Sequence, residues 1–286
     1  MILYLVLHRS DRTHYKLPDI TKVSGKQISK LEVSKAGKTL VLNKKDNTWY
    51  IGAKEYPADS AKVKKMLDVI EELTLTALVS ESKNYVRYDL SHETLSREFD
   101  IGKAATTYQH TFVRLATDPN VYHALGNFRR EFDKTVDELR DKIVLSFTEK
   151  DIRELTLFKD KKTMILTQTQ VSEQEDKTSK EPEAQIVWQN ADGKNVDKEK
   201  VKSLLSFLHR LECEAYINNA KKDDFKNPTC AIALRGDKKY SFSVFAKKDK
   251  DAKTYPAISS ENDYPFSLSD SQVESIKSKI ENILDL

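Results

Sequence analysis

The stretch ADSAKVKKMLDVIEEL, residues 58–73, occurs twice, and the rest of the chain is organised around its two copies. A second copy, VDKEKVKSLLSFLHRL, stands at residues 196–211, and adding 138 to each number of the first copy aligns six identities in sixteen positions. Apolar residues in both copies recur at i, i+3, i+4 and i+7, which places them on one face of a helix. Asp59 and Asp197 precede the two stripes, where a carboxylate accepts hydrogen bonds from the free N–H groups of a first turn. The sequence therefore predicts two capped helices, each with one buried face.

Strand-like segments surround both helices. Residues 28–42 form a hairpin pattern around the turn residues Ala36 and Gly37, and the same pattern returns 124 positions later. Trp49 and Trp188 mark a third strand in each half. Further strands are predicted at 74–81, 96–102, 108–117 and 120–125, and at 212–218, 229–235, 239–247 and 254–259.

Residues near the end of the two halves also match each other. Tyr108 matches Tyr240 and Tyr122 matches Tyr255. Each half then closes with a predicted helix, in which Val136, Leu139 and Ile143 match Val273, Ile276 and Ile280. Offsets that hold within elements and change in loops are typical of duplication.

The predicted fold class is α+β, a tandem duplication of a β-β-β-α-β-β-β-α unit with mainly antiparallel sheets and helices packed on one face. We expect an N-terminal segment over 1–20, a first repeat over 21–147 and a second over 148–286. The second repeat carries an insertion at 167–184, TQTQVSEQEDKTSKEPEA, which has no aromatic residue. Such a polar segment cannot bury enough surface to offset its ordering, so it predicts a mobile loop or hairpin tip, with a partner-binding arm as the alternative.

Composition restricts the classes of function. Of the 286 residues 33% are charged, but 48 basic residues meet 45 acidic ones and the formal net charge is +3. Cations and anions are interleaved rather than segregated, which argues against a nucleic-acid partner. Cys213 and Cys230 both lie in the second half, so we interpret them as unpaired core residues, with a disulfide between them as the alternative.

The first residues, MILYLVLHRSDRTHYKLP, hold an apolar run from Ile2 to Leu7. A membrane span needs about 20 apolar residues, and a signal peptide needs a basic region ahead of its apolar one. The run is therefore either an ordinary strand or the last turns of a membrane helix.

Motifs for catalysis, cofactors and metals were sought, and no catalytic, cofactor-binding or metal-binding residue is predicted. The seven glycines form no phosphate-cradling loop and no Gly-x-Ser-x-Gly elbow. His92-Glu93 and Asp223-Asp224 suit turns, and Asp249-Lys250-Asp251 fails the EF-hand pattern. None of the histidines has zinc-ligand spacing: His8, His14, His92, His110, His123 and His209. Trp49 and Trp188 are interpreted as core residues under the helices, with an aromatic groove as the alternative.

Three segments go beyond architecture: KTLVLNKKDNTWYI (38–51), YQHTFVRLATDPNVYHAL (108–125) and DKTVDELRDKIVLSFTEKDIRELTL (133–157). With Val113-Arg114, Val121-Tyr122 and Leu139-Arg140-Asp141-Lys142 before Phe147, the chain resembles the bacterial family DUF4340. The sequence Tyr88-Asp89-Leu90-Ser91 departs from that family, where Gly more often precedes Leu, which puts the turn geometry there in doubt. The resemblance implies an envelope protein with one N-terminal membrane helix and an extracytoplasmic domain, often encoded beside gliding-motility-type ABC transporters. It implies no catalytic residues.

Three hypotheses of function follow. The first is a non-enzymatic, membrane-tethered envelope domain that acts as a protein-interaction or accessory module, for which an ABC transporter complex is one candidate partner. The second is a peptide- or glycan-binding module that uses a cleft between the two repeats. The third is an enzyme with a site dispersed along the sequence.

Overall fold

The computed structural model describes residues 16–80, 86–91, 96–116, 118–171 and 185–285. The chain divides between Asp141 and Lys142 into two compact units. Each unit has its own cluster of buried apolar side chains.

The first unit is built around one antiparallel sheet. Within the described residues the sheet has nine strands in the order β4-β3-β2-β1-β6-β7-β8-β9-β5. Helix α2 follows β4, and two short helices follow β9. The elements are η1 (Gly25–Gln27), β1 (Lys30–Lys35), β2 (Lys38–Lys45), β3 (Thr48–Ile51), β4 (Tyr56–Pro57), α2 (Ser60–Glu71), β5 (Leu75–Ser80), β6 (Val86–Ser91), β7 (Ser96–Ala104), β8 (His110–Leu115), β9 (Val121–Leu125), α3 (Arg129–Phe132) and α4 (Val136–Leu139).

The second unit has a sheet of the same described size and corresponding order, β14-β13-β12-β11-β17-β18-β19-β20-β16. Strands β10 and β15 pair with each other in a separate two-stranded sheet. The elements are β10 (Ile143–Ser146), η2 (Glu149–Asp151), β11 (Glu154–Lys159), β12 (Lys162–Val171), β13 (Gln185–Asn190), β14 (Asn195–Val196), α5 (Lys198–Leu208), β15 (Arg210–Glu212), β16 (Ala215–Tyr216), η3 (Lys222–Asp224), β17 (Cys230–Arg235), β18 (Lys239–Val244), β19 (Thr254–Ser259), β20 (Phe266–Ser269) and α6 (Asp270–Leu284).

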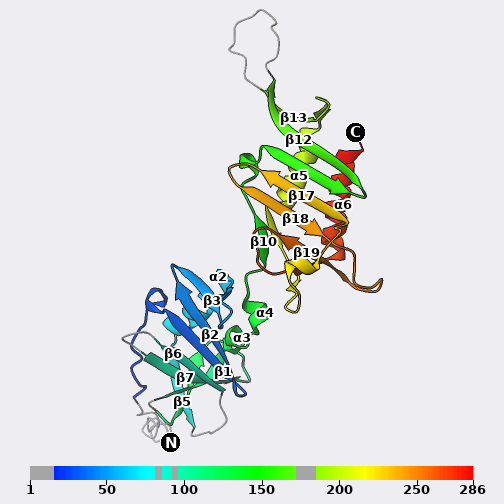
Figure 1. The fold of residues 1–286 in the computed structure, drawn as a ribbon. Coiled ribbons are helices and arrows are strands. Elements are labelled where there is room, and N and C mark those ends of the chain that lie inside the picture. The colour runs from blue at the N-terminus through cyan, green and yellow to red at the C-terminus, as the bar shows by residue number, and fades with distance from the viewer. Residues whose placement is uncertain (1–15, 81–85, 92–95, 117, 172–184, 286) are drawn as a thin grey trace, which may run out of the picture. The chain divides into compact units, whose positions relative to one another are not determined.

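Helices α5 and α6 lie side by side against one face of the second sheet (Figure 1). Buried residues alternate along the strands, as Leu155 and Leu157 do on β11 and Ile232 and Leu234 do on β17. A strand presents successive side chains to opposite faces, so this alternation assigns one face of the sheet to the core.

Helices α2 and α5 have the predicted caps and buried faces. The Asp59 carboxylate accepts the N–H groups of Ala61 and Lys62, and the Asp197 carboxylate accepts that of Glu199. The buried residues of α2 are matched 138 positions later by those of α5: Val63, Met66, Leu67 and Ile70 in the first helix, and Val201, Leu204, Leu205 and Leu208 in the second. Each helix therefore contributes one apolar stripe to its own core.

The predicted correspondence between the later strands was wrong by one strand. Strand β6 was not predicted, although it pairs with β1 as β17 pairs with β11. The expected turn at residues 88–91 is part of this strand. By position in the sheet, β7 corresponds to β18 and β8 to β19, so Tyr122 on β9 does not match Tyr255 on β19. Tyr108 lies before β8 with a positive φ of 56° and matches no strand residue.

The predicted helix at the end of the first half was also wrong in its extent. Helix α4 ends at Leu139, and Ile143 begins strand β10. That strand pairs with β15, which follows α5, so residues 142–147, the last part of the predicted first repeat, lie in the second unit. The backbone of Asp141 instead donates to the Pro57 carbonyl, which ends the first unit against β4.

The segment 167–184 is divided in the structure. Residues 167–171 continue strand β12 and pair with β13, so they are not a loop. Residues 172–184 lie outside the described residues, as do residues 1–15 with their apolar run. No helix within the described ranges is long and apolar enough to span a membrane. The class α+β with mainly antiparallel sheets is confirmed.

Candidate functional site

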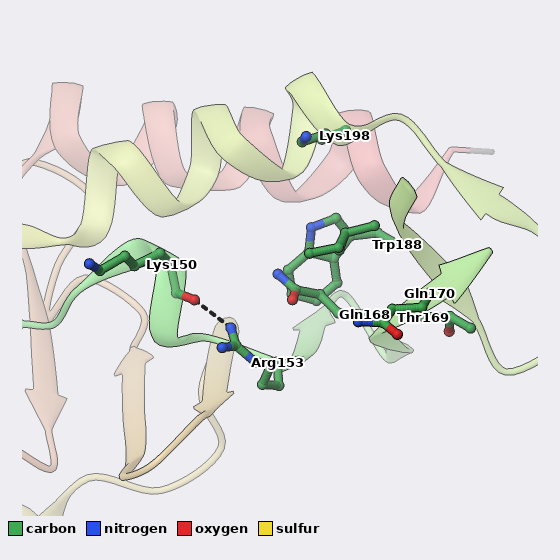
Figure 2. A pocket seen from close by; sticks show the side chains of 8 residues that line it. Lys150, Arg153, Gln168, Thr169, Gln170, Trp188 and Lys198 are labelled. Atoms are coloured by element: carbon green, nitrogen blue, oxygen red, sulfur yellow. Dashed lines mark hydrogen bonds between the residues drawn. The ribbon is translucent and has the colours of Figure 1, made fainter. Parts of the chain in front are cut away.

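A pocket of about 520 Å³ lies in the second unit, on the side of the sheet that carries the helices. Figure 2 shows Lys198, the first residue of α5, above Trp188 and Gln168. Lys150 and Arg153, from the turn η2 and the approach to β11, lie to one side. The lining is completed from the two long strands β12 and β13 by Thr169, Gln170 and Ile186.

The pocket lies where the β12–β13 ribbon extends beyond its core-packed part, which contains Leu166 and Trp188. The pairing of the two strands runs from Leu166 and Asn190 out to Val171 and Gln185. In the first unit the corresponding strands turn back at Asp46 and Asn47, which have positive φ angles of 46° and 68°. The longer ribbon therefore gives the second unit a surface without a counterpart among the described residues of the first.

Trp188 forms the base of the pocket. Its side chain is only 4% exposed and packs in the core of the second unit. The neighbouring residue on the same face, Ile186, is 46% exposed. Because residues two apart on a strand share a face, the apolar surface continues from the core into the pocket.

Backbone hydrogen bonds fix the cationic wall. The Gln168 N–H donates to the Arg153 carbonyl at 2.9 Å, which ties β12 to the segment before β11. The Arg153 guanidinium donates in turn to the Lys150 carbonyl, the dashed line in Figure 2. This bond holds the guanidinium near η2, at one side of the pocket.

The pocket is positively charged. Lys150, Arg153 and Lys198 line it, and no carboxylate appears among its described lining residues. Nearby acids have other partners: Asp197 caps α5, and Glu149 accepts a hydrogen bond from Ser206. A concave surface with cations of one sign concentrates anions, and the N-terminal end of α5 adds a partial positive charge.

The histidines examined in the sequence are dispersed. His209 lies with Nδ1 3.6 Å from Glu149 and 2.7 Å from the Ser206 carbonyl oxygen. His110 and His123 stack in the first unit with ring centroids 5.3 Å apart. Burial, and the neighbouring His110, lower the pKa of His123 below 6.5. His8, His14 and His92 lie outside the described residues.

The acidic pairs form turns. Asp249 accepts the Asp251 N–H at 3.1 Å, and Asp224 accepts the Lys221 N–H at 2.7 Å. Within the described parts of the chain no group of three or more His, Cys, Asp or Glu residues could hold a metal ion.

The cysteines and tryptophans are core residues. Cys213 and Cys230 are both buried and are not joined by a disulfide, so the alternative of a bridge between them was wrong. Burial raises the pKa of the Cys230 thiol to about 11. Trp49 is 5% exposed in the core of the first unit, and the prediction of a core tryptophan in each half is confirmed.

The motif Leu139-Arg140-Asp141-Lys142 lies at the junction of the two units. Arg140 is 2% exposed, and its guanidinium lies 3.9 Å from the centre of the Tyr56 ring in the first unit. Lys142 donates to the Glu214 carbonyl at 3.3 Å in the second. Arg140 therefore packs within the first unit, and the Lys142 side chain is bound within the second.

Fold and pocket together define a class, a two-unit α+β protein whose second unit carries a positively charged pocket. The sequence model of the family described as Domain of unknown function (DUF4340) matches residues 49–228. The match covers more than half of the chain, so the chain belongs to this family. It runs from β3 of the first unit to the segment before β17 of the second, and therefore includes the pocket. No curated protein and no solved structure matches the chain.

Proposed function

We propose that the protein is a non-enzymatic interaction module of the cell envelope, which holds a protein partner at the pocket of its second unit. The observation that carries this proposal is the lining of that pocket. It combines an apolar base, Trp188 and Ile186, with the amides of Gln168 and Gln170 and three cations. A few polar groups around apolar surface are typical of recognition sites. A cleft between the two units stays a prediction.

The two units are, in our proposal, descendants of one duplicated module. Corresponding strand orders support this, as do the aspartate caps and matched buried positions of α2 and α5. The turns η1 and η2 lie 124 residues apart and carry the same backbone bonds, from Ile28 to Gly25 and from Ile152 to Glu149. After duplication one copy is free to change, and the long β12–β13 ribbon is the change that created the pocket.

The envelope location of the proposal rests on the resemblance described above and on the apolar run from Ile2 to Leu7. A membrane tether places the module beside membrane complexes, of which an ABC transporter is the candidate that the resemblance suggests. Carbonate extraction of membranes from cells that express the natural gene tests the tether. A tethered protein stays in the pellet, and a protein released by carbonate contradicts this part of the proposal.

Photocrosslinking in cells tests the binding role. Ile186 is replaced by p-benzoylphenylalanine, whose reactive group then stands at the mouth of the pocket. The matched control is the same substitution at Ile165, which is 48% exposed where Ile186 is 46% exposed. The two sites lie on opposite faces, because Ile165 neighbours the buried Leu166 while Ile186 pairs with Gln170 on the pocket side.

The proposal expects a discrete protein adduct from the variant at Ile186 and none from the variant at Ile165. Absence of an adduct at Ile186 overturns the binding role of the pocket. Equal adducts at both positions overturn it too, because they indicate non-specific contact with the ribbon.

A further inference from the structure

We propose that the pocket binds an acidic peptide segment in extended form, which adds as a strand to the outer edge of β13. This inference rests on the proposed function and specifies the chemistry of the partner. It follows from an open strand edge and a cationic pocket that lie side by side.

The edge is open over the first half of β13. Strand β14 pairs with Trp188 and Gln189, and the chain then turns into α5 at the cap residue Asp197. Gln185–Val187 consequently has no strand partner on that side among the described residues. A strand edge of this kind offers N–H and C=O groups to an extended peptide, and side-chain pockets beside it give specificity.

The charges beside the edge select the peptide. Lys198 stands at the start of α5 and lines the pocket together with Ile186 of the open edge, while Lys150 and Arg153 lie to one side of it. Neither lysine makes an ion pair within the described residues, and no carboxylate lines the site. Side chains of a bound strand alternate between two faces, so every second residue points toward the cations. Glu or Asp at those positions directs negative charge toward the cationic pocket.

A lipid headgroup or free phosphate is a poorer fit to the same surface. It would use the cations but leave the Ile186 side chain, the Trp188 base and the amides of Gln168 and Gln170 without partners. A peptide engages all of these groups, because it supplies carbonyl and N–H groups together with side chains.

Fluorescence anisotropy on the purified full chain tests the inference. The probe is a fluorescein-labelled octapeptide of alternating Glu and Val, and its control replaces each Glu with Gln. The protein variants are Lys150→Gln, Arg153→Gln, Lys198→Gln and the triple combination. Lys239→Gln on β18, also exposed and outside the pocket lining, is the matched control. The fluorescence of Trp188 and the urea midpoint verify that each variant is folded.

We expect each pocket substitution to weaken binding about two- to fivefold and the triple variant about tenfold or more, since partly exposed ion pairs contribute up to about 1 kcal/mol each. Lys239→Gln leaves the affinity unchanged, and the Gln-containing peptide binds weakly. Methylating the backbone nitrogens of alternate peptide residues in one register abolishes binding, whereas methylation in the other register is tolerated, because one edge of an added strand faces β13.

Three results overturn the inference. The first is a loss of affinity with Lys239→Gln equal to that with the pocket substitutions. The second is an affinity that backbone methylation leaves unchanged in both registers. The third is a protein that does not bind the peptide but sediments with phosphatidylglycerol vesicles, where the triple substitution abolishes the sedimentation. Failure of the peptide combined with a specific adduct at Ile186 overturns the ligand class but leaves the proposed function standing. Failure of the adduct overturns the proposed function itself.

Discussion

Substitution of Met66 and Leu204 by alanine measures whether each unit is stabilised by its own core. Both residues are fully buried at corresponding positions of α2 and α5. Removing a buried Met or Leu side chain costs about 3 kcal/mol of unfolding free energy, the sum of lost transfer energy and the remaining cavity. A domain of this size loses about 2 kcal/mol of stability per molar urea, so the urea midpoint of the affected unit falls by about 1.5 M.

The two tryptophans provide the assay, because each unit contains one, Trp49 in the first and Trp188 in the second. In a Trp188→Phe background, fluorescence follows the first unit, and in a Trp49→Phe background it follows the second. Met66→Ala is expected to lower the midpoint reported by Trp49 and leave that reported by Trp188 unchanged, and Leu204→Ala is expected to do the opposite. Equal shifts of both midpoints with either substitution would contradict the claim that each unit is stabilised by its own core.

Three further predictions concern single side chains. Cys230, with a pKa raised to about 11 by burial, is expected to resist iodoacetamide at pH 8 in the folded protein and to react in urea, as mass spectrometry detects; labelling of the native thiol contradicts this. Arg140→Ala removes the guanidinium from the Tyr56 ring and is expected to destabilise the first unit by about 2 kcal/mol, measured through Trp49, while Arg130→Ala, whose side chain is 86% exposed, serves as the exposed-surface comparison. The lowered pKa of His123 means that the unfolded chain takes up that proton first as the pH falls below 6.5, so the first unit loses stability between pH 7 and pH 5. His123→Phe is expected to flatten that dependence, and an unchanged slope argues against it.

The sequence predicts the helices and their caps best, because local signals determine them. Asp59 and Asp197 stand just before the apolar stripes of α2 and α5, and the helical spacing of the apolar residues indicates which side chains are buried. Strands carry weaker local signals. The short β6 and β20 were missed because a few alternating residues between polar ones resemble a loop, and only pairing with β1 or β16 makes them strands. Ile143 continues the helical spacing of Val136 and Leu139 but pairs with β15, so tertiary contacts override the periodicity.

The pocket could not be predicted because its residues come from four separate segments. Lys150 and Arg153 precede β11, Gln168 belongs to β12, Trp188 to β13 and Lys198 to α5. Their convergence depends on the register of β12 against β13 and on where α5 begins. One sequence signal did point to the region. The insertion that distinguishes the second half falls where β12 and β13 extend beyond their core-packed part.

Hydrogen–deuterium exchange of the full protein, with and without the alternating Glu–Val peptide, tests whether the peptide adds as a strand to the edge of β13. Alternate residues of β13 direct their N–H groups toward β12 and toward the outer edge, where Asn190 donates to the Lys194 carbonyl, so Ile186 is the residue of Gln185–Val187 whose N–H faces outward. Strand addition puts this N–H into a hydrogen bond and slows its exchange, while amides in Lys30–Ile51 of the first unit keep their rates. Saturating peptide that leaves the exchange of the Ile186 amide unchanged would contradict the claim that this edge and its pocket receive the partner.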